Sequence, residues 1–138
     1  MQVARKRRAV ILDTHTILSY LDGESSAELV ANIISDAIEE DVPICITAVN
    51  AAEIWAVLAQ RVSENDATRS LNELQQLGIQ VVEADWNLAL EAGVLKSRYK
   101  LSLSSCFTAA LTIQKRGVLI TGDEEFKRID KGVSIEWI

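Results

Sequence analysis

The stretch Ala9–Leu18 reads AVILDTHTIL, and the interpretation of the whole chain starts from it. Four apolar residues are followed at once by the acid Asp13, and then by Thr14, His15 and Thr16. A short continuous apolar run is typical of a strand that is covered on both faces. Why such a strand ends on a carboxylate depends on where the other strands end.

Length and composition indicate one folded domain. The 138 residues are 49% apolar and 25% charged, which is ordinary for a protein with a buried core. The formal net charge of −6 argues against binding nucleic acid by bulk positive charge, so any RNA contact needs a local basic patch or bound cations. One such patch is Arg5–Arg8, although charge runs at chain ends are usually solvated. We expect a single domain over residues 1–138, with residues 1–8 as a flexible basic tail.

The cysteines and the N-terminal segment indicate the cellular compartment of the protein. Cys45 and Cys106 stand in apolar surroundings without Cys-x-x-Cys spacing, so we expect core residues of a reduced protein. The apolar run after the basic start is too short for a signal peptide, and no stretch approaches a membrane span. These features predict a soluble, cytoplasmic protein without a membrane partner.

Short β-branched runs alternate along the chain with long amphipathic patterns. The expected strands are Ala9–Leu12, Pro43–Thr47, Gln80–Glu83, Gly117–Thr121 and Ser134–Trp137. The expected helices are Ser26–Glu40, Asn50–Arg61, Asp66–Leu77, Trp86–Tyr99 and Ser104–Lys115, with a short helix after Asp13. This alternation predicts an α/β fold in which a central parallel sheet has helices on both faces.

Three acids fall at one edge of the expected sheet. Asp13 follows the first strand directly, Asp123 follows the fourth strand through Thr121 and Gly122, and Glu53 lies on the first turn of the helix after the second strand. In parallel α/β sheets, the functional side chains gather at the carboxyl ends of the strands. Three unpaired carboxylates repel one another unless a cation lies between them, and oxygen ligands favour a hard ion such as Mg²⁺ or Mn²⁺.

Each acid also has a purely structural explanation. Asp13 fits a helix cap, Glu53 fits the closing residue of a capping box that begins at Asn50, and Asp123 fits a helix N-terminus within a box over Thr121–Glu124. Three such acids at one sheet edge favour the metal site over three separate caps.

The segments ILDTHTILSYL, ITAVNAAEIWAVL, LSLSSCFTAAL and VLITGDEEF resemble PIN domains in their order and spacing. The likeness covers nearly the whole chain and is greatest to the VapC-like ribonuclease toxins of type II toxin–antitoxin modules. It implies a PIN-like three-layer α/β/α sandwich with a central parallel sheet. It also implies a pocket of four acids that binds Mg²⁺ or Mn²⁺ and cleaves RNA, a homodimer, and silencing by a cognate antitoxin protein.

The resemblance transfers to named residues. The first acid of the family falls on Asp13, the second on Glu53 and the last on Asp123, with Thr121 as a hydroxyl near the metal and Thr14 in a supporting position. The implied ligands are Asp13 and Asp123, with Glu53 acting through water. Replacing Asp13 should then abolish activity with little loss of stability.

The third acid of the family is replaced by Ser105. A serine hydroxyl is neutral and a weak metal ligand, so we expect weaker metal affinity than four acids would give. Ser105 or Ser104 also fits a helix N-cap. Glu124 and Glu125 are near in sequence and are candidates to compensate, although Glu124 serves a capping box equally well. The sequence therefore predicts a metal-dependent endoribonuclease with a weakened site, or an impaired PIN-fold protein that acts through protein binding.

The remaining aromatic and imidazole side chains have simpler explanations. His15 is the only histidine, and a packing or hydrogen-bonding role is favoured over acid–base catalysis. Trp55, Trp86 and Trp137 fit core or dimer-interface positions. A phosphatase with an aspartyl nucleophile, of the haloacid-dehalogenase type, needs a second Asp two residues after the first, where His15 stands.

Overall fold

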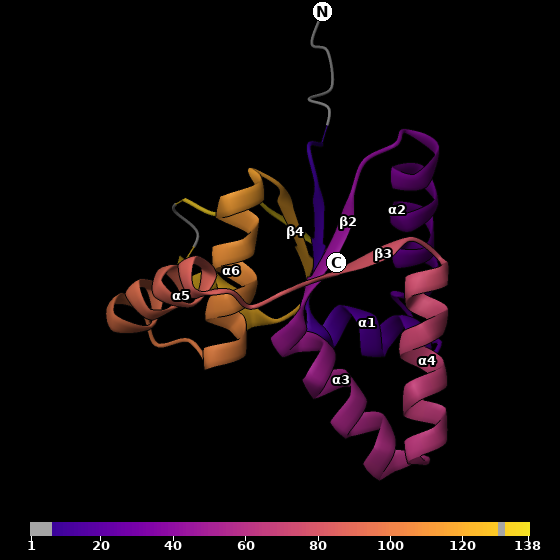
Figure 1. Cartoon of the computed structure of the whole chain (residues 1–138). Helices are drawn as coiled ribbons and strands as arrows, with labels where there is room; N and C mark the ends of the chain where they lie inside the picture. Colours follow the sequence, from indigo (N-terminus) through magenta and orange to yellow (C-terminus); the bar gives the residue numbers. More distant parts are fainter. Residues whose placement is uncertain (1–6, 130–131) are drawn as a thin grey trace, which may run out of the picture.

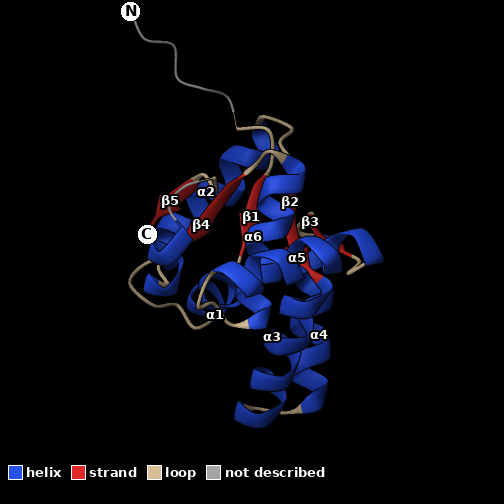
Figure 2. Ribbon diagram, turned by 90° about the vertical axis from the view of Figure 1, so that its left-hand side faces the viewer, coloured by secondary structure: helices blue, strands red, loops and turns tan. Residues whose placement is uncertain are grey.

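Figure 1 shows the computed structural model, which describes residues 7–129 and 132–138. Its strands form a single five-stranded sheet in the order β3-β2-β1-β4-β5, and every neighbouring pair is parallel. Figure 2 shows this order across the sheet, with β1 in the middle. The strands are β1 Val10–Leu12, β2 Ile44–Thr47, β3 Ile79–Val82, β4 Val118–Thr121 and β5 Ile135–Trp137. The expected parallel α/β sheet is confirmed.

The helices lie on both sides of this sheet, as a three-layer sandwich requires. They are α1 Thr14–Leu21, α2 Ala27–Glu39, α3 Ala48–Arg61, α4 Glu64–Gln76, α5 Trp86–Arg98 and α6 Leu103–Lys115, followed by a short 3₁₀ helix over Glu124–Ile129. Helices α5 and α6 pack on one side, and α1 to α4 pack on the other (Figure 1). The two layers leave the carboxyl ends of the strands at one edge.

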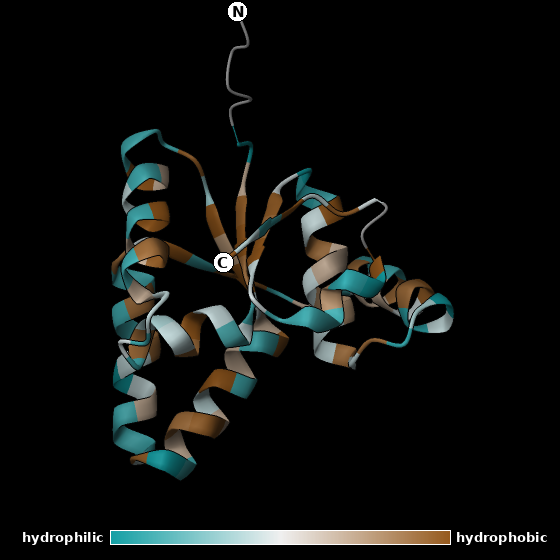
Figure 3. Cartoon of the chain, turned by 180° about the vertical axis from the view of Figure 1, so that it is seen from behind, coloured by the Kyte–Doolittle hydropathy of each residue, from teal (hydrophilic) through white to brown (hydrophobic). Residues whose placement is uncertain are grey.

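Two apolar cores fill the space between the layers, because successive strand residues point to opposite faces. Val10 and Leu12 belong to the core under α1 to α4, while Ile11 belongs to the core under α5 and α6. Ile11 pairs with Cys45 on β2 and with Leu119 on β4, so these three residues are in register and point to the same face of the sheet. Figure 3 shows these strands as the most hydrophobic part of the chain, between helices with mixed faces.

The core positions expected for the cysteines are confirmed, and for the tryptophans the structure decides only the core half of the core-or-interface prediction. Cys45 and Cys106 are both buried with free thiols. Trp86 is 74% exposed and Trp137 is 43% exposed, so neither is a core residue of this chain. Trp86 is the first residue of α5, outside the contact of that helix with the sheet. Trp55 is partly buried and donates its indole N–H to Thr68 at 3.1 Å.

Residues 5 and 6 of the N-terminal basic run lie outside the described residues. Arg7 is described, and its guanidinium donates to both carboxylate oxygens of Glu136 on β5, at 2.6 and 2.8 Å. The tail expected over residues 1–8 otherwise falls on residues 1–6. In the part of the chain that the structure describes, none of the helices is long and apolar enough to span a bilayer.

Candidate metal centre

Asp13 is a buried carboxylate at the point where β1 passes into α1. Its side chain accepts from the backbone N–H of Thr16 at 2.8 Å, which caps α1, and from the hydroxyl of Thr121 at 2.5 Å. The residue is only 4% exposed. Burial raises the pKa of Asp13 above its ordinary value, while the hydrogen bonds from Thr121 and Thr16 oppose that rise. The expected capping role is therefore real, yet the second oxygen faces a different strand.

Thr121 joins Asp13 to Asp123 through one hydroxyl. This hydroxyl donates to Asp13 and accepts from the backbone N–H of Asp123 at 3.0 Å. Asp123 in turn accepts from the backbone N–H of Glu125 at 2.9 Å, which begins the 3₁₀ helix. Glu124 takes no part in the box expected for it, because its carboxylate is exposed and pairs with Lys127.

Glu53 is held by the neighbouring helix α1. The N-cap of α3 is Thr47, whose hydroxyl accepts from the N–H of Asn50 at 2.9 Å, so the capping box expected from Asn50 to Glu53 is wrong. The helix begins earlier because Thr47 leaves β2 in the extended conformation that a cap requires. Glu53 instead accepts from the hydroxyl of Thr14 at 2.8 Å. This contact ties the acid to the residue that follows Asp13.

Asn50 is the central polar residue that sequence analysis did not assign to the site. It is 2% exposed. Its amide donates to the hydroxyl of Thr14 at 2.9 Å, and its carbonyl accepts from Thr47 at 2.5 Å and from Thr108 of α6 at 2.8 Å. A signal was present, because Asn50 is four residues before the buried Ile54 and is therefore a polar residue on the apolar stripe of α3.

Ser105 is in the first turn of α6 but does not cap it. The cap is Ser102, whose hydroxyl accepts from the N–H of Ser105 at 3.3 Å, so the caps expected at Ser104 or Ser105 are wrong. The hydroxyl of Ser105 donates to Glu125 at 3.1 Å. Glu125 also accepts from the backbone N–H of Ser102. A carboxylate from another element thus contacts the serine at the position where the resemblance implies an acid.

His15 is exposed on α1, so the packing role expected for it is wrong. It lies at the rim of the acids, since a Cβ added to Gly122 would be 3.8 Å from its ring carbon Cδ2. Its charge favours the ionised form of Asp13 and thereby opposes the rise in the pKa of that carboxyl. The exposed side of α1 faces solvent because the buried positions of this helix are Thr16, Ile17 and Ser19.

The oxygen-rich donor set suits a hard cation, but the acids are not drawn together into a complete cage. Across residues 7–129 and 132–138, no three His, Cys, Asp or Glu side chains are grouped closely enough to hold a metal ion. The ion pairs recorded for those residues include none of Asp13, Glu53 and Asp123. Their chemistry fits Mg²⁺ or Mn²⁺, and a bound cation would compensate the buried charge of Asp13.

The family model for the PIN domain matches residues 10–132, which is most of the chain. The chain belongs to the PIN domain family. This membership confirms the family recognised from the four sequence segments and agrees with the observed layers. No curated protein sequence matches this PIN-domain chain.

Solved structures share the fold at low identity. VapBC2 from Rickettsia felis, bound to a promoter DNA fragment, is 15% identical, with a TM-score of 0.76 over 94% of this chain and 98% of that one. DNA-bound VapBC from Salmonella typhimurium is 18% identical, with a TM-score of 0.72 over 94% and 97%. Mycobacterium tuberculosis VapC20, a sarcin–ricin loop cleaving toxin, is 14% identical, with a TM-score of 0.67 over 86% and 93%. These likenesses extend over nearly the full length of each chain.

Proposed function

We propose that this PIN-domain protein is a metal-dependent endoribonuclease, the toxin of a toxin–antitoxin pair, and that it uses Mg²⁺ or Mn²⁺. The observation that carries the proposal is Asp13, a buried carboxylate at the carboxyl end of the central strand, linked through Thr121 to Asp123 and paired with no cation among the described residues. Isolated buried charge is costly, and sites that retain it usually have a functional reason.

Each residue of the site has its own role in the proposed reaction. Asp13 and Asp123 bind the metal ion, and Glu53 acts through water. Thr121 orients both aspartates through its hydroxyl, while Thr14 holds the Glu53 carboxylate. When bound, the metal supplies Lewis acidity, a more acidic water and positive charge against the scissile phosphate. That charge also explains how a protein with a net charge of −6 binds RNA.

The comparisons support the partners in this proposal. The structures from R. felis and S. typhimurium are VapBC structures, and VapC20 is a sarcin–ricin loop cleaving toxin. By analogy, this chain cleaves RNA and is silenced by a cognate antitoxin protein. We further propose that it acts in the cytoplasm, where free thiols such as those of Cys45 and Cys106 stay reduced.

The outer face of α5 supports a homodimer. Trp86, Leu90 and Val94 recur every four residues and are 74%, 49% and 45% exposed, so they form one apolar stripe. A stripe of this kind is typical of an interface. The occupant we propose is a second copy of α5 in the antiparallel orientation, which a twofold axis perpendicular to the helix produces.

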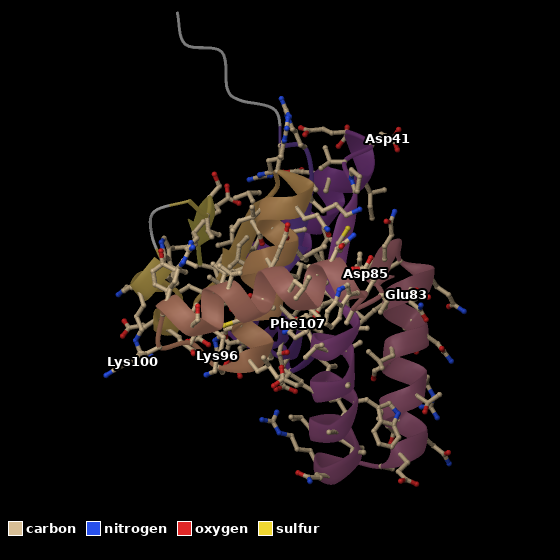
Figure 4. All side chains as sticks on the ribbon, turned by 60° about the vertical axis from the view of Figure 1, so that its left-hand side comes forward. Asp41, Glu83, Asp85, Lys96, Lys100 and Phe107 are labelled. Carbon is tan, nitrogen blue, oxygen red and sulfur yellow. The ribbon has the colours of Figure 1, made fainter. Side chains whose placement is uncertain are left out.

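Charge at the two ends of α5 favours this self-pairing. Figure 4 shows Glu83 and Asp85 at the N-terminal end of the helix and Lys96 and Lys100 at its C-terminal end. Two antiparallel copies bring the acidic end of one to the basic end of the other. Leu90→Lys should convert the dimer into a folded monomer in light scattering. A monomeric wild-type chain, or a dimer in the variant, contradicts the proposed interface.

A second candidate function is an impaired PIN-fold protein that acts through its antitoxin. Ser105 favours it, because the position of the third acid carries no charge, and so does the incomplete grouping of the acids. The two candidates differ in whether RNA is cut.

The test is cleavage of a panel of structured RNAs with added Mg²⁺ or Mn²⁺. We expect cutting that a chelator stops, that Asp13→Asn abolishes without unfolding the protein, and that Ser105→Asp increases. If only Ser105→Asp cuts, the impaired candidate is correct. If Asp13→Asn cuts as well as the wild type, the proposed active site is wrong.

A further inference from the structure

We propose that Glu125 supplies the carboxylate that Ser105 lacks, so that the fourth acid of this metal site comes from the segment after β4 instead of from α6. This inference rests on the proposed function and adds one residue to its site. The negative charge that is absent at residue 105 is then supplied by the carboxylate of Glu125.

The contacts of Glu125 hold its carboxylate against the side chain at the substituted position. One oxygen accepts from the hydroxyl of Ser105 at 3.1 Å and from that of Ser102 at 3.4 Å. The other accepts from the backbone N–H of Ser102. Ser102 and Ser105 also share a hydrogen bond at 2.9 Å. The carboxylate is therefore anchored on the first turn of α6, against the side chain at the substituted position.

The backbone of Glu125 connects this residue to the rest of the site. The backbone N–H of Glu125 donates to Asp123 at 2.9 Å, and Asp123 is linked through Thr121 to Asp13. The connection therefore runs from Ser105 of α6, through the segment after β4, to the end of β1. Glu125 and Asp123 are two residues apart on one turn, so the backbone holds the two residues close together.

Glu124 shows that this arrangement is specific to one of two adjacent glutamates. Its side chain is 83% exposed and pairs with Lys127 at 3.1 Å. Glu125 has only neutral donors in the contacts described, and these belong to a helix N-terminus, which stabilises an anion. A carboxylate held by neutral donors keeps its negative charge available to a cation. Glu124 is thus a control with the same change of charge.

The experiment is a calorimetric titration of Mn²⁺ into six proteins: the wild type, Asp13→Asn, Glu125→Gln, Ser105→Asp, the double variant Glu125→Gln with Ser105→Asp, and Glu124→Gln. We expect Glu125→Gln to weaken Mn²⁺ binding by at least about tenfold, and Glu124→Gln to change it by less than about twofold. Ser105→Asp in the Glu125→Gln background should restore binding, because either position then supplies the same charge. Thermal melts without metal accompany each titration.

The rival explanation is that Glu125 only caps α6. It predicts a lower melting temperature for metal-free Glu125→Gln and an unchanged Mn²⁺ affinity, so that Ser105→Asp has no loss to restore, and that result overturns the inference. If Glu125→Gln binds like the wild type while Asp13→Asn does not bind, the inference fails and the proposed function stands. If no protein in the set binds Mn²⁺, including Ser105→Asp, the proposed function fails with it.

Discussion

Replacing Thr121 by valine removes one buried hydroxyl and keeps nearly the same volume. That hydroxyl donates to Asp13 at 2.5 Å and accepts from the N–H of Asp123 at 3.0 Å. A hydrogen bond to a charged group contributes about 1.5–3 kcal/mol, and a neutral one about 1 kcal/mol. We expect Thr121→Val to lower the free energy of unfolding by about 3 kcal/mol at neutral pH, which lowers Tm by about 10 °C for a chain of this size.

The size of this loss should depend on pH, because Asp13 titrates. Burial raises the pKa of Asp13 in the folded protein above the ordinary value of 3.8 that applies to the unfolded chain. The folded state therefore binds the proton more tightly, and the contribution of Asp13 to stability falls as pH rises from 3.8 to the folded pKa. Because the Thr121 hydrogen bond opposes that rise, Thr121→Val raises the folded pKa further. Its destabilisation is then greatest above the folded pKa and smallest below it.

Thr112→Val is the matched control. Thr112 is 1% exposed, and its hydroxyl donates to the carbonyl of Thr108 at 2.9 Å without touching an acid. We expect a loss of about 1 kcal/mol that does not vary with pH. The assay is urea unfolding of the three proteins from acidic to neutral pH, with a chelator present. Equal losses in the two variants, or a Thr121→Val loss that is the same at every pH, would refute the reasoning.

Two further substitutions test the packing at the amino ends of β1 and β4 and the polar contacts of the site. Gly117→Ala should lower the free energy of unfolding by about 1–3 kcal/mol, because the added Cβ would lie 2.7 Å from the carbonyl oxygen of Ala9. Gly93→Ala is the control and should be neutral or stabilising, because nothing lies within contact of its added Cβ. Equal Tm values for the two variants would contradict this. Asn50→Ala should lower the free energy of unfolding in urea by at least about 2 kcal/mol, because the buried hydroxyl of Thr47 loses its acceptor. A smaller loss than that of Thr112→Val would show that the Asn50 contacts contribute little to stability.

The strands and their parallel arrangement were predictable, because a strand that is buried on both faces is marked by a continuous apolar run in the sequence. Runs such as Ala9–Leu12 are continuous and apolar, and alternation with helices restricts the topology to a parallel sheet. The placement of Asp13, Asp123 and Glu53 near the carboxyl edge follows from the same topology. These inferences need only the pattern of one element and its position in the chain.

The details of the site were less predictable because they depend on partners far away in sequence. Thr47 and Ser102 cap their helices because each leaves the preceding segment in an extended conformation, which a residue pattern does not specify. Glu125 meets Ser105 across 20 positions, and Asn50 meets Thr108 across 58. Contacts of this kind exist only after the sheet has brought α3, α6 and the segment after β4 to one edge.

The central claim is that the acids around Asp13 form a metal site, and Mn²⁺ binding to the wild type and to Asp13→Asn tests it most directly. Asparagine keeps the shape of the side chain and removes the charge, so melts of both proteins without metal report whether the fold is retained. We predict saturable binding by the wild type and none by a folded Asp13→Asn. Equal Mn²⁺ affinity in the two proteins, or no binding by the wild type, would contradict the account.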